Sequence, residues 1–503
     1  MATAVVEERQ LLKSLRWWDG FAIAMCNPGF LFGSLGYTLG IFGVWGSVIL
    51  WGVSALIGWV LTWIYVEPAT MFPNKSGGIS VYAHEAWRKY TTFVGPIAAF
   101  GYWIGWSVVL AIFGKIIGDL VVARWFPAQA PTATHDWFTI GKVYFGLPHA
   151  IAIGCIVAVW AFNIFGIRPM KSFTYITGGL LTLALLVFTI VPYLTGDWHS
   201  SNVHATFTGP WGGTKLAFVY LFILGWSSWA AEVCATFAPE YKTRHDTTLA
   251  LRSSAIFVVG VFTLLPLGLG GVTGAPPASG QEGEFYSSAF QTIAGHTLGT
   301  FFLICLLASL LLSMSSSTAD GGRALYGISR AGMTIKQLGV LNKYHVPGRA
   351  MTVDLFVNCA LVLFISSNLA ILYMSNIGYV LAHLLAVSGF LLLRKDRPNW
   401  PRPIRVGPIW TPIAWFMTAL IAFLLIVGAG APHLNGYGNW TDFGIGVGVL
   451  VASVLLFVFR RIVQDGEPVH FREATPTTPG PGDGFEGEAA PAVMTVAEGT
   501  SLV

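Results

Sequence analysis

The stretch AMCNPGFLFGSLG, residues 24–36, lies near the start of a long apolar run and holds Asn27, Pro28 and Gly29 in succession. Proline lacks a backbone N–H and clashes with the preceding helical turn, and glycine adopts backbone angles that other residues avoid. The apolar run predicts a helix, and the triplet predicts that this helix is interrupted inside the run.

The composition of the whole chain shows where such a helix lies. The chain has 503 residues, of which 54% are hydrophobic and only 10% are charged, and it contains 20 tryptophans. This balance excludes an ordinary soluble globule and a disordered chain. We therefore predict an all-α polytopic membrane protein.

Windows of about 20 apolar residues predict twelve transmembrane helices, of which the ninth is short. Their predicted ranges are 21–43, 46–66, 93–122, 145–166, 173–194, 215–238, 253–273, 297–319, 352–367, 370–393, 410–430 and 441–460. The remaining segments are a cytoplasmic N-terminal segment, residues 1–18, and a tail rich in Pro, Gly and acidic residues, residues 463–503, which we expect to be disordered.

The positive charges indicate the orientation of these helices. Of the 28 Lys and Arg residues, 24 fall on the side of the N-terminus, and only Arg124, Lys142 and Lys215 fall on the opposite side. Cytoplasmic loops carry the positive excess in membrane proteins. The pattern predicts a multi-pass protein of the cell membrane with both termini in the cytoplasm.

Several classes of function find no support in the sequence. It contains no His-Glu-x-x-His, no Cys-x-x-Cys and no phosphate-binding glycine loop with lysine. Its five cysteines lie in predicted spans and predict neither a disulfide framework nor a metal site. Glu7 and Glu8, with no early basic cluster, argue against a cleavable signal. We expect no enzyme, no cofactor, no metal and no nucleic-acid partner.

The interrupted first helix has a mechanistic implication. Residues 20–26 would span roughly 10 Å of the ~30 Å hydrocarbon core, so the break lies within the bilayer. Peptide groups freed there must be enclosed by protein or line a watery cavity, where they can bind a substrate or an ion. A proline kink satisfied by neighbouring helices is the alternative.

The sixth span offers a partner for this break. The segment YLFILGWSSWAAEVC, residues 220–234, contains Gly225, Trp226 and Ser227, and an ionisable residue, Glu232. Interrupted helices at the first and sixth positions are expected of a five-plus-five inverted repeat, here about residues 19–196 and 213–396, with its site at the midplane.

Four motifs give the chain a family resemblance. They are VEPATMFPNKSGGISVYAHEAW (66–87), FNIFGIRPMK (162–171), APEYKTRHDTTLALR (238–252) and RALYGISRAGM (323–333). In order, spacing and sidedness they resemble the motifs of the amino acid-polyamine-organocation (APC) permeases, over roughly residues 17–460.

This resemblance implies a leucine-transporter-type core of ten helices, residues 19–396, with two peripheral helices in residues 397–462. It also implies secondary active transport of an amino acid by alternating access. Two groups of residues carry over by position. The carboxylate would bind at Asn27, Pro28, Gly29 and Phe30, and the amine at Phe222, Ile223, Leu224 and Gly225, beside Trp226 and Ser227.

The coupling ion stays open between a proton and sodium. Pro28 cannot donate a hydrogen bond, and Ser227 stands where many members of the family carry an acid. Glu232 is the first candidate to carry a proton, and the alternative is a structural acid paired with a loop Arg or Lys. Sodium needs several oxygens, which Ser309 and Ser313 could help to supply.

Other residues and other functions remain as alternatives. Lys115 and Asp119 are either a self-satisfied pair or a substrate contact in the outer vestibule, and His383 is either a hydrogen-bonded core residue or a proton relay. Trp103, Trp106 and Trp226 are candidates for a lid or for packing. The substrate is a small or neutral L-amino acid or, alternatively, an amine, a polyamine or a cationic amino acid. A channel or a non-transporting sensor is the rival function.

Overall fold

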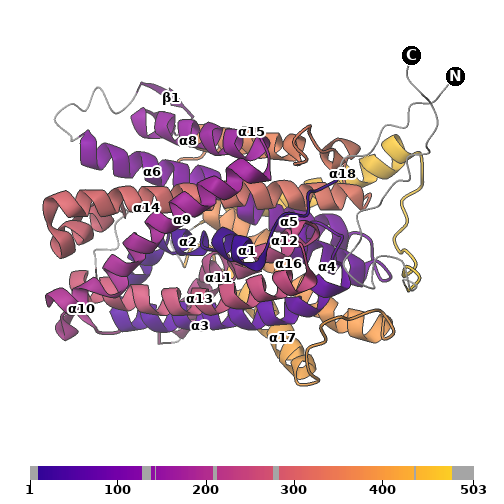
Figure 1. Ribbon diagram of the computed structural model, residues 1–503, viewed down its shortest axis with the longest axis horizontal. Coiled ribbons are helices and arrows are strands. Elements are labelled where there is room, and N and C mark those ends of the chain that lie inside the picture. The colour runs from indigo at the N-terminus through magenta and orange to yellow at the C-terminus, as the bar shows by residue number, and fades with distance from the viewer. Residues whose placement is uncertain are drawn as a thin grey trace, which may run out of the picture.

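The computed structural model describes residues 10–126, 137–141, 143–207, 212–275, 282–434 and 438–478. Long helices run side by side along the molecule, and a small hairpin, β1 (Phe138–Ile140) and β2 (Val143–Phe145), lies at the end opposite the two termini (Figure 1). The prediction of an essentially all-helical protein is confirmed for the described residues.

The helices follow one another with few long connections. Those of the first half are α1 (Trp17–Ala24), α2 (Asn27–Phe32), α3 (Leu35–Met71), α4 (Gly78–Trp87), α5 (Val94–Ser107), α6 (Val109–Trp125), α8 (Leu147–Ile164), α9 (Ile167–Thr189) and α10 (Val191–Thr195). Those of the second half are α11 (Thr214–Ser228), α12 (Val233–Thr236), α13 (Arg244–Thr273), α14 (Glu282–Arg330), α15 (Gly348–Phe364), α16 (Asn368–Asp396), α17 (Trp410–Ala429) and α18 (Trp440–Phe459).

Ten helices of the described chain are long and apolar enough to cross a membrane, compared with twelve predicted spans. The ninth predicted span corresponds to α15, whose 17 residues extend about 25 Å. The first predicted span, residues 21–43, covers the second half of α1, all of α2 and the start of α3, and neither α1 nor α2 would cross the bilayer alone. A backbone break at Gly43, where φ is +67°, separates the first predicted span from the second.

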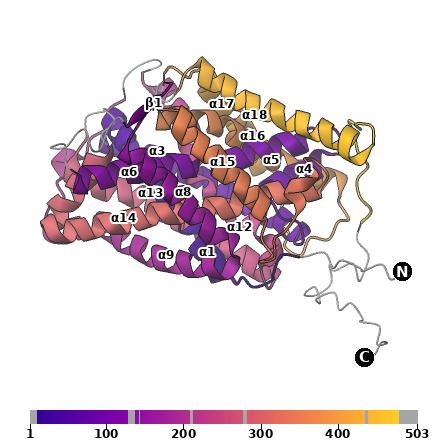
Figure 2. The ribbon, with the colours of Figure 1, turned by 90° about the horizontal axis from the view of Figure 1, so that it is seen from above.

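The interior is built from helices that are distant in sequence. Helix α3 packs against α13, α5 against α16, and α9 against α14. Helix α17 packs against α16 and α11, and α18 packs against α16 and α5, so that both cover the outside of the bundle on the same edge in Figure 2. The first and sixth predicted spans are therefore surrounded by other helices.

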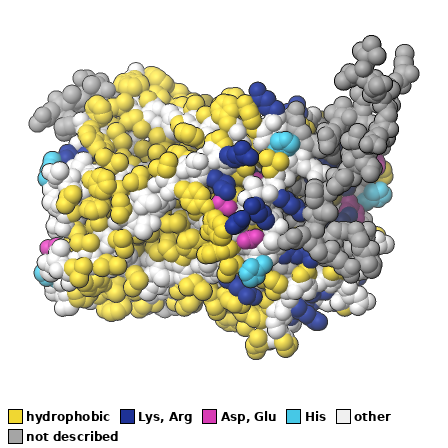
Figure 3. Space-filling view, in the orientation of Figure 1, with side chains coloured by type: hydrophobic (Ala, Val, Ile, Leu, Met, Phe, Trp, Pro, Cys, Tyr) yellow, Lys and Arg dark blue, Asp and Glu magenta, His cyan; other side chains and the backbone are white. Residues whose placement is uncertain are grey.

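The surface matches a membrane environment. Figure 3 shows hydrophobic side chains over most of the visible face, whereas most Lys and Arg side chains gather toward the end that carries the termini. Large apolar side chains such as Ile176, Leu194 and Ile426 are exposed. Because a soluble protein would bury such residues, this surface faces lipid.

Part of the predicted disordered tail makes defined contacts. The π-helical turn Arg460–Asp465 extends α18, and the following chain returns to the connection between α4 and α5. Glu473 pairs with Arg88 and Arg461 at 2.6 and 2.7 Å, and the Phe471 ring meets Phe93 edge to face. Residues 479–503 of the predicted tail lie outside the described residues.

Candidate functional site

The first helix is interrupted two residues before the Pro-Gly pair. Helix α1 ends at Ala24, Met25 and Cys26 form a turn, and α2 begins at Asn27. Pro28 is thus the second residue of a helix, a position where its missing N–H leaves no intrahelical bond unmade. The triplet starts the second half-helix.

Carbonyl groups at this break are satisfied by polar side chains from the protein. Ser313 Oγ donates to the Cys26 carbonyl at 2.7 Å, and Ser316 Oγ donates to the Ile23 carbonyl at 3.3 Å. The Asn27 side chain donates to the Ala24 carbonyl at 2.6 Å. Helix α14 therefore supplies the hydroxyl groups that allow a broken backbone to be buried at this depth.

Gly29 allows α2 to approach α14 closely. A β-carbon at Gly29 would lie 2.1 Å from Ser313 Oγ and 3.3 Å from Ser313 Cβ. We expect Gly29→Ala to displace the half-helix, to destabilise the protein by about 1–3 kcal/mol and to reduce transport. Thermal unfolding and substrate uptake measure the two effects.

Two further variants make this test specific. Gly260→Ala, the same change in α13 where an added β-carbon meets nothing within 4 Å, is the control and should leave both properties unchanged. Adding Ser313→Ala should partly rescue the Gly29→Ala variant because it removes the overlapping oxygen. Equal behaviour of Gly29→Ala and Gly260→Ala would contradict the close-approach argument.

The interruption of the sixth span lies farther along the chain than the sequence suggested. Helix α11 continues through Gly225 to Ser228, and after Trp229 a 3₁₀ turn (Ala230–Glu232) leads into the short helix α12. The carbonyl of Phe222 accepts from Asn376 at 2.7 Å, and that of Leu224 accepts from Ser228 Oγ at 2.9 Å. These two carbonyls of the predicted amine site therefore already accept hydrogen bonds from side chains of the protein.

An aromatic cluster fills the space between the two interrupted helices. The ring of Phe30 makes edge-to-face contacts with Trp106, Phe113 and Trp226, at centroid distances of 5.3, 5.5 and 5.0 Å. Ser227 Oγ donates to the Phe30 carbonyl at 3.2 Å and joins the two interrupted helices directly. All five residues are buried. A substrate that binds here must displace these rings, which is the action expected of a lid.

Of the three tryptophans considered for a lid, Trp103 has a different place. Its indole N–H donates to Asp354 Oδ1 at 2.7 Å, which ties α5 to α15. The other Asp354 oxygen has no hydrogen-bond partner in the described chain and lies against Gly321. Sequence reasoning did not single out this buried carboxyl.

Glu232 lies at the second interruption and is 1% exposed. Its Oε1 accepts from the Tyr379 hydroxyl at 2.7 Å, and its Oε2 accepts from the Tyr102 hydroxyl at 3.4 Å. His383 Nε2 lies 3.7 Å from Oε1, while His383 Nδ1 is hydrogen-bonded to Tyr65 at 2.9 Å. Within the described residues Glu232 has no Lys or Arg partner, contrary to the alternative of a structural ion pair.

A second carboxyl, that of Asp320, belongs to the same network. The Tyr102 hydroxyl lies 3.1 Å from Asp320 Oδ1 and 3.4 Å from Glu232 Oε2. Because this hydroxyl has one proton, it can donate to only one of the two carboxyls at a time. Asp320 Oδ2 has no hydrogen-bond partner among the described residues, and the side chain is fully buried. Neither carboxyl forms an ion pair with a Lys or Arg of the described residues, and two such buried anions near one hydroxyl are disfavoured, so the geometry favours a proton held by this pair.

Asp320 was missed because the predicted eighth span stops at residue 319. The helix continues to Arg330, so Asp320 is inside the bundle. Its helical spacing of seven residues from Ser313, which places both on one face, is the signal that could have identified it.

Of the other predicted coupling residues, Ser313 contacts the first helix break and Lys115 contacts the end of α15. Ser309 Oγ is buried without a hydrogen-bond partner in the described chain, one turn from Ser313. Lys115 Nζ donates to the carbonyls of Ile365 and Ser366, both at 2.9 Å, and so satisfies the end of α15. Lys115 thus has a structural partner beyond Asp119.

The buried acids of the family-like motifs, in contrast, are neutralised. Glu67 pairs with Arg394 at 2.7 Å and Arg402 at 3.0 Å, and Glu240 forms a two-pronged pair with Arg323. Burial alone raises the pKa of the Glu85 carboxyl, but the nearby positive groups, led by Lys75, outweigh it and lower the pKa to about 2. These acids tie helix ends together through ion pairs with Lys and Arg side chains.

The fold and this site define a polytopic membrane protein in which two interrupted helices meet at a buried polar network, an arrangement typical of carriers. A family model described as "Amino acid permease" matches residues 15–454. The chain therefore belongs to the amino acid permease family of the APC superfamily, as its motifs predicted.

Three curated proteins are similar to the chain. The "Glutamate/serine transporter AimA" of Bacillus subtilis is 22% identical, over 84% of this chain and 82% of that protein. The "Lysine-specific permease" of Saccharomyces cerevisiae is 21% identical, over 78% and 67%. "Solute carrier family 7 member 12" of Mus musculus is 23% identical, over 54% and 58%. These relatives are permeases and transporters, so the prediction that the chain is not an enzyme is confirmed.

Proposed function

We propose that this protein carries an amino acid across the cell membrane by alternating access and that protons drive the transport. The observation that carries the proposal is the buried Glu232–Tyr102–Asp320 network, which has no Lys or Arg partner in the described chain. A carboxyl group in such a place inside a membrane protein is a candidate proton carrier. Its position beside the second helix break would link protonation to movement of that helix.

The five-plus-five inverted repeat is part of this proposal, and the helix contacts support it. A repeat that relates the first five spans to the next five pairs α1 with α11, α3 with α13, α5 with α14 and α9 with α16. The contact between α5 and α16 then corresponds to that between α14 and α9, and both are present. The contact between α1 and α13 likewise corresponds to that between α11 and α3.

We propose a neutral L-amino acid as the substrate. The residues that would enclose it are Phe30, Trp106, Phe113 and Trp226, whose rings favour an apolar side chain over a charged one. The relatives named for glutamate and serine or for lysine show that this family divides by substrate. A cationic amino acid or amine is the second candidate, and it would place its positive group at Glu232.

The orientation follows the positive charges. Most Lys and Arg side chains on the face in Figure 3 gather at the end that carries both termini, and cytoplasmic loops hold this excess in membrane proteins. We therefore place both termini in the cytoplasm, and the Glu240–Arg323 pair on that side of the bundle.

Transport in proteoliposomes tests the function. We expect counterflow of a labelled neutral amino acid, and accumulation driven by an inward proton gradient without sodium. Sodium dependence with no response to pH would instead favour an ion site at the Cys26 carbonyl and Ser313, whose oxygens lie 2.7 Å apart. Binding without counterflow would indicate a sensor, and conductance without counterflow would indicate a channel. Either result would overturn the carrier proposal.

A further inference from the structure

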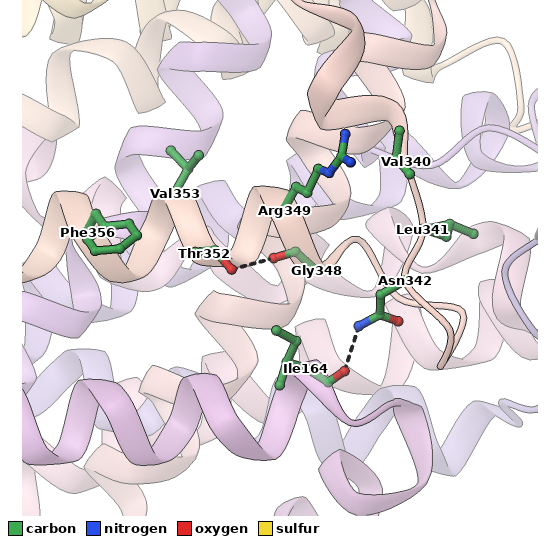
Figure 4. A pocket seen from close by; sticks show the side chains of 9 residues that line it. All are labelled: Ile164, Val340, Leu341, Asn342, Gly348, Arg349, Thr352, Val353 and Phe356. Carbon is green, nitrogen blue, oxygen red and sulfur yellow. Dashed lines mark hydrogen bonds between the residues drawn. The ribbon is translucent and has the colours of Figure 1, made fainter.

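A groove of about 620 Å³ lies on the bundle between α8 and α15, away from the network at Glu232 (Figure 4). Ile164 at the end of α8 forms one wall. Val340 and Asn342, from the segment before α15, lie at one end, and Arg349, Val353 and Phe356 of α15 line its length. The end at Asn342 belongs to the side of the molecule that carries the termini, because His345 contacts the Gln10 carbonyl at 2.9 Å.

The groove changes from polar to apolar along α15. Arg349 is the second residue of this helix, and Phe356 lies seven residues farther on, about 10 Å deeper into the membrane region. The side chain of Phe356 is 69% exposed and that of Val353 is 37% exposed, so both are available to an apolar chain. A ligand that fits this gradient has a polar head and a hydrocarbon tail.

No acidic side chain of the described residues pairs with the positive charge of the groove. Asn342 donates to the Ile164 carbonyl at 2.7 Å and Thr352 donates to the Gly348 carbonyl at 2.8 Å, as the dashed lines in Figure 4 show. Arg349, in contrast, is exposed and forms no hydrogen bond or ion pair with any described residue. The neighbouring Lys343 contacts only the ring of Tyr344 among these residues. The groove therefore favours an anionic head group.

We propose that this groove binds one anionic phospholipid from the leaflet at the basic end of the molecule. The lipid phosphate would bind the Arg349 guanidinium, whose planar donors suit phosphate oxygens, and an acyl chain would lie along Val353 and Phe356. Lipid binding here would hold α8 and α15 together at a site separate from the substrate route.

Native mass spectrometry of the full-length protein tests the proposal, with phosphatidylglycerol and phosphatidylcholine as the two probes. Because one basic side chain near a membrane surface contributes about fivefold in affinity, we expect phosphatidylglycerol to bind about fivefold more tightly. Arg349→Ala should abolish this preference. Arg405→Ala, which removes another exposed arginine, in the connection between α16 and α17, is the matched control and should keep it.

Two further arms separate the lipid from other ligands. Val353→Trp, which fills the apolar part and leaves the charge unchanged, should reduce binding of both lipids. Soluble glycerol phosphate should fail to compete, since it lacks the acyl chains. A preference for phosphatidylglycerol that survives Arg349→Ala, or full competition by glycerol phosphate, would overturn the proposal.

Discussion

Glu232→Gln is expected to abolish proton-driven accumulation of substrate while exchange of labelled for unlabelled substrate continues. A glutamine keeps the size and most hydrogen bonds of the side chain, but its amide does not gain or lose a proton at any pH at which the protein is folded. One proton moving down 100 mV supplies about 2.3 kcal/mol, which corresponds to roughly 40-fold accumulation. The variant should therefore fall from this ratio to about one.

The measurement compares uptake driven by a proton gradient with counterflow in the same proteoliposomes. Asp354→Asn is the matched control, because Asp354 is also a buried carboxyl but contacts Trp103 rather than the Tyr102 network. It should retain accumulation. If Glu232→Gln still accumulates substrate, Glu232 is not the proton carrier. If counterflow also disappears, a direct contact between Glu232 and a cationic substrate becomes the better explanation.

Arg323→Met is expected to produce the largest loss of stability, because it leaves the Glu240 carboxylate buried without its partner. Both side chains are about 1–2% exposed, and the guanidinium also lies over the Phe237 ring at 4.4 Å. Removing one partner of such a buried pair costs about 3–5 kcal/mol. Thermal unfolding of the purified protein in detergent measures the loss as a lower midpoint.

The double variant Arg323→Met with Glu240→Met should recover most of this stability, since two apolar side chains leave no unpaired charge. Lys89→Met, which breaks the ion pair between a lysine that is 51% exposed and Asp396, is the control and should change the midpoint much less than Arg323→Met does. Equal midpoints for the Arg323 and Lys89 variants would contradict the argument from burial. The backbone of Glu240 also holds the N-terminal segment, because its carbonyl accepts hydrogen bonds from the backbone N–H groups of Ser14 and Leu15.

Family membership was accessible from the sequence because its motifs are short and continuous. The acids of these motifs, Glu67 and Glu240, are recognisable as a pattern along the chain, and the family comparison confirms what they indicated. The pairing of each acid with a distant arginine is not recognisable in this way. Arg394 lies 327 residues from Glu67, and Arg323 lies 83 residues from Glu240.

The position of the second helix break shows a different limit. The sequence predicted an interruption at Gly225, but the helix continues to Ser228. Gly225 instead lets the Trp229 ring pack closely, since an added β-carbon would lie 3.1 Å from that ring. The break occurs where the chain turns to bring Glu232 toward Tyr102 and Tyr379. Local propensity identified the region, and packing against α5 and α16 decided the residue.

From its sequence alone, this chain is recognisable as a helical membrane protein of the amino acid permease family with an interrupted first helix. Hydropathy, breaker residues and contiguous motifs are local properties, so they can be read along the chain. Which buried acids have a positively charged partner, in contrast, depends on how the helices pack in three dimensions. Charge compensation depends on contacts between helices that are distant in sequence. Asp320 of α14 and Glu232, immediately before α12, share the Tyr102 hydroxyl of α5, and this contact cannot be read along the chain.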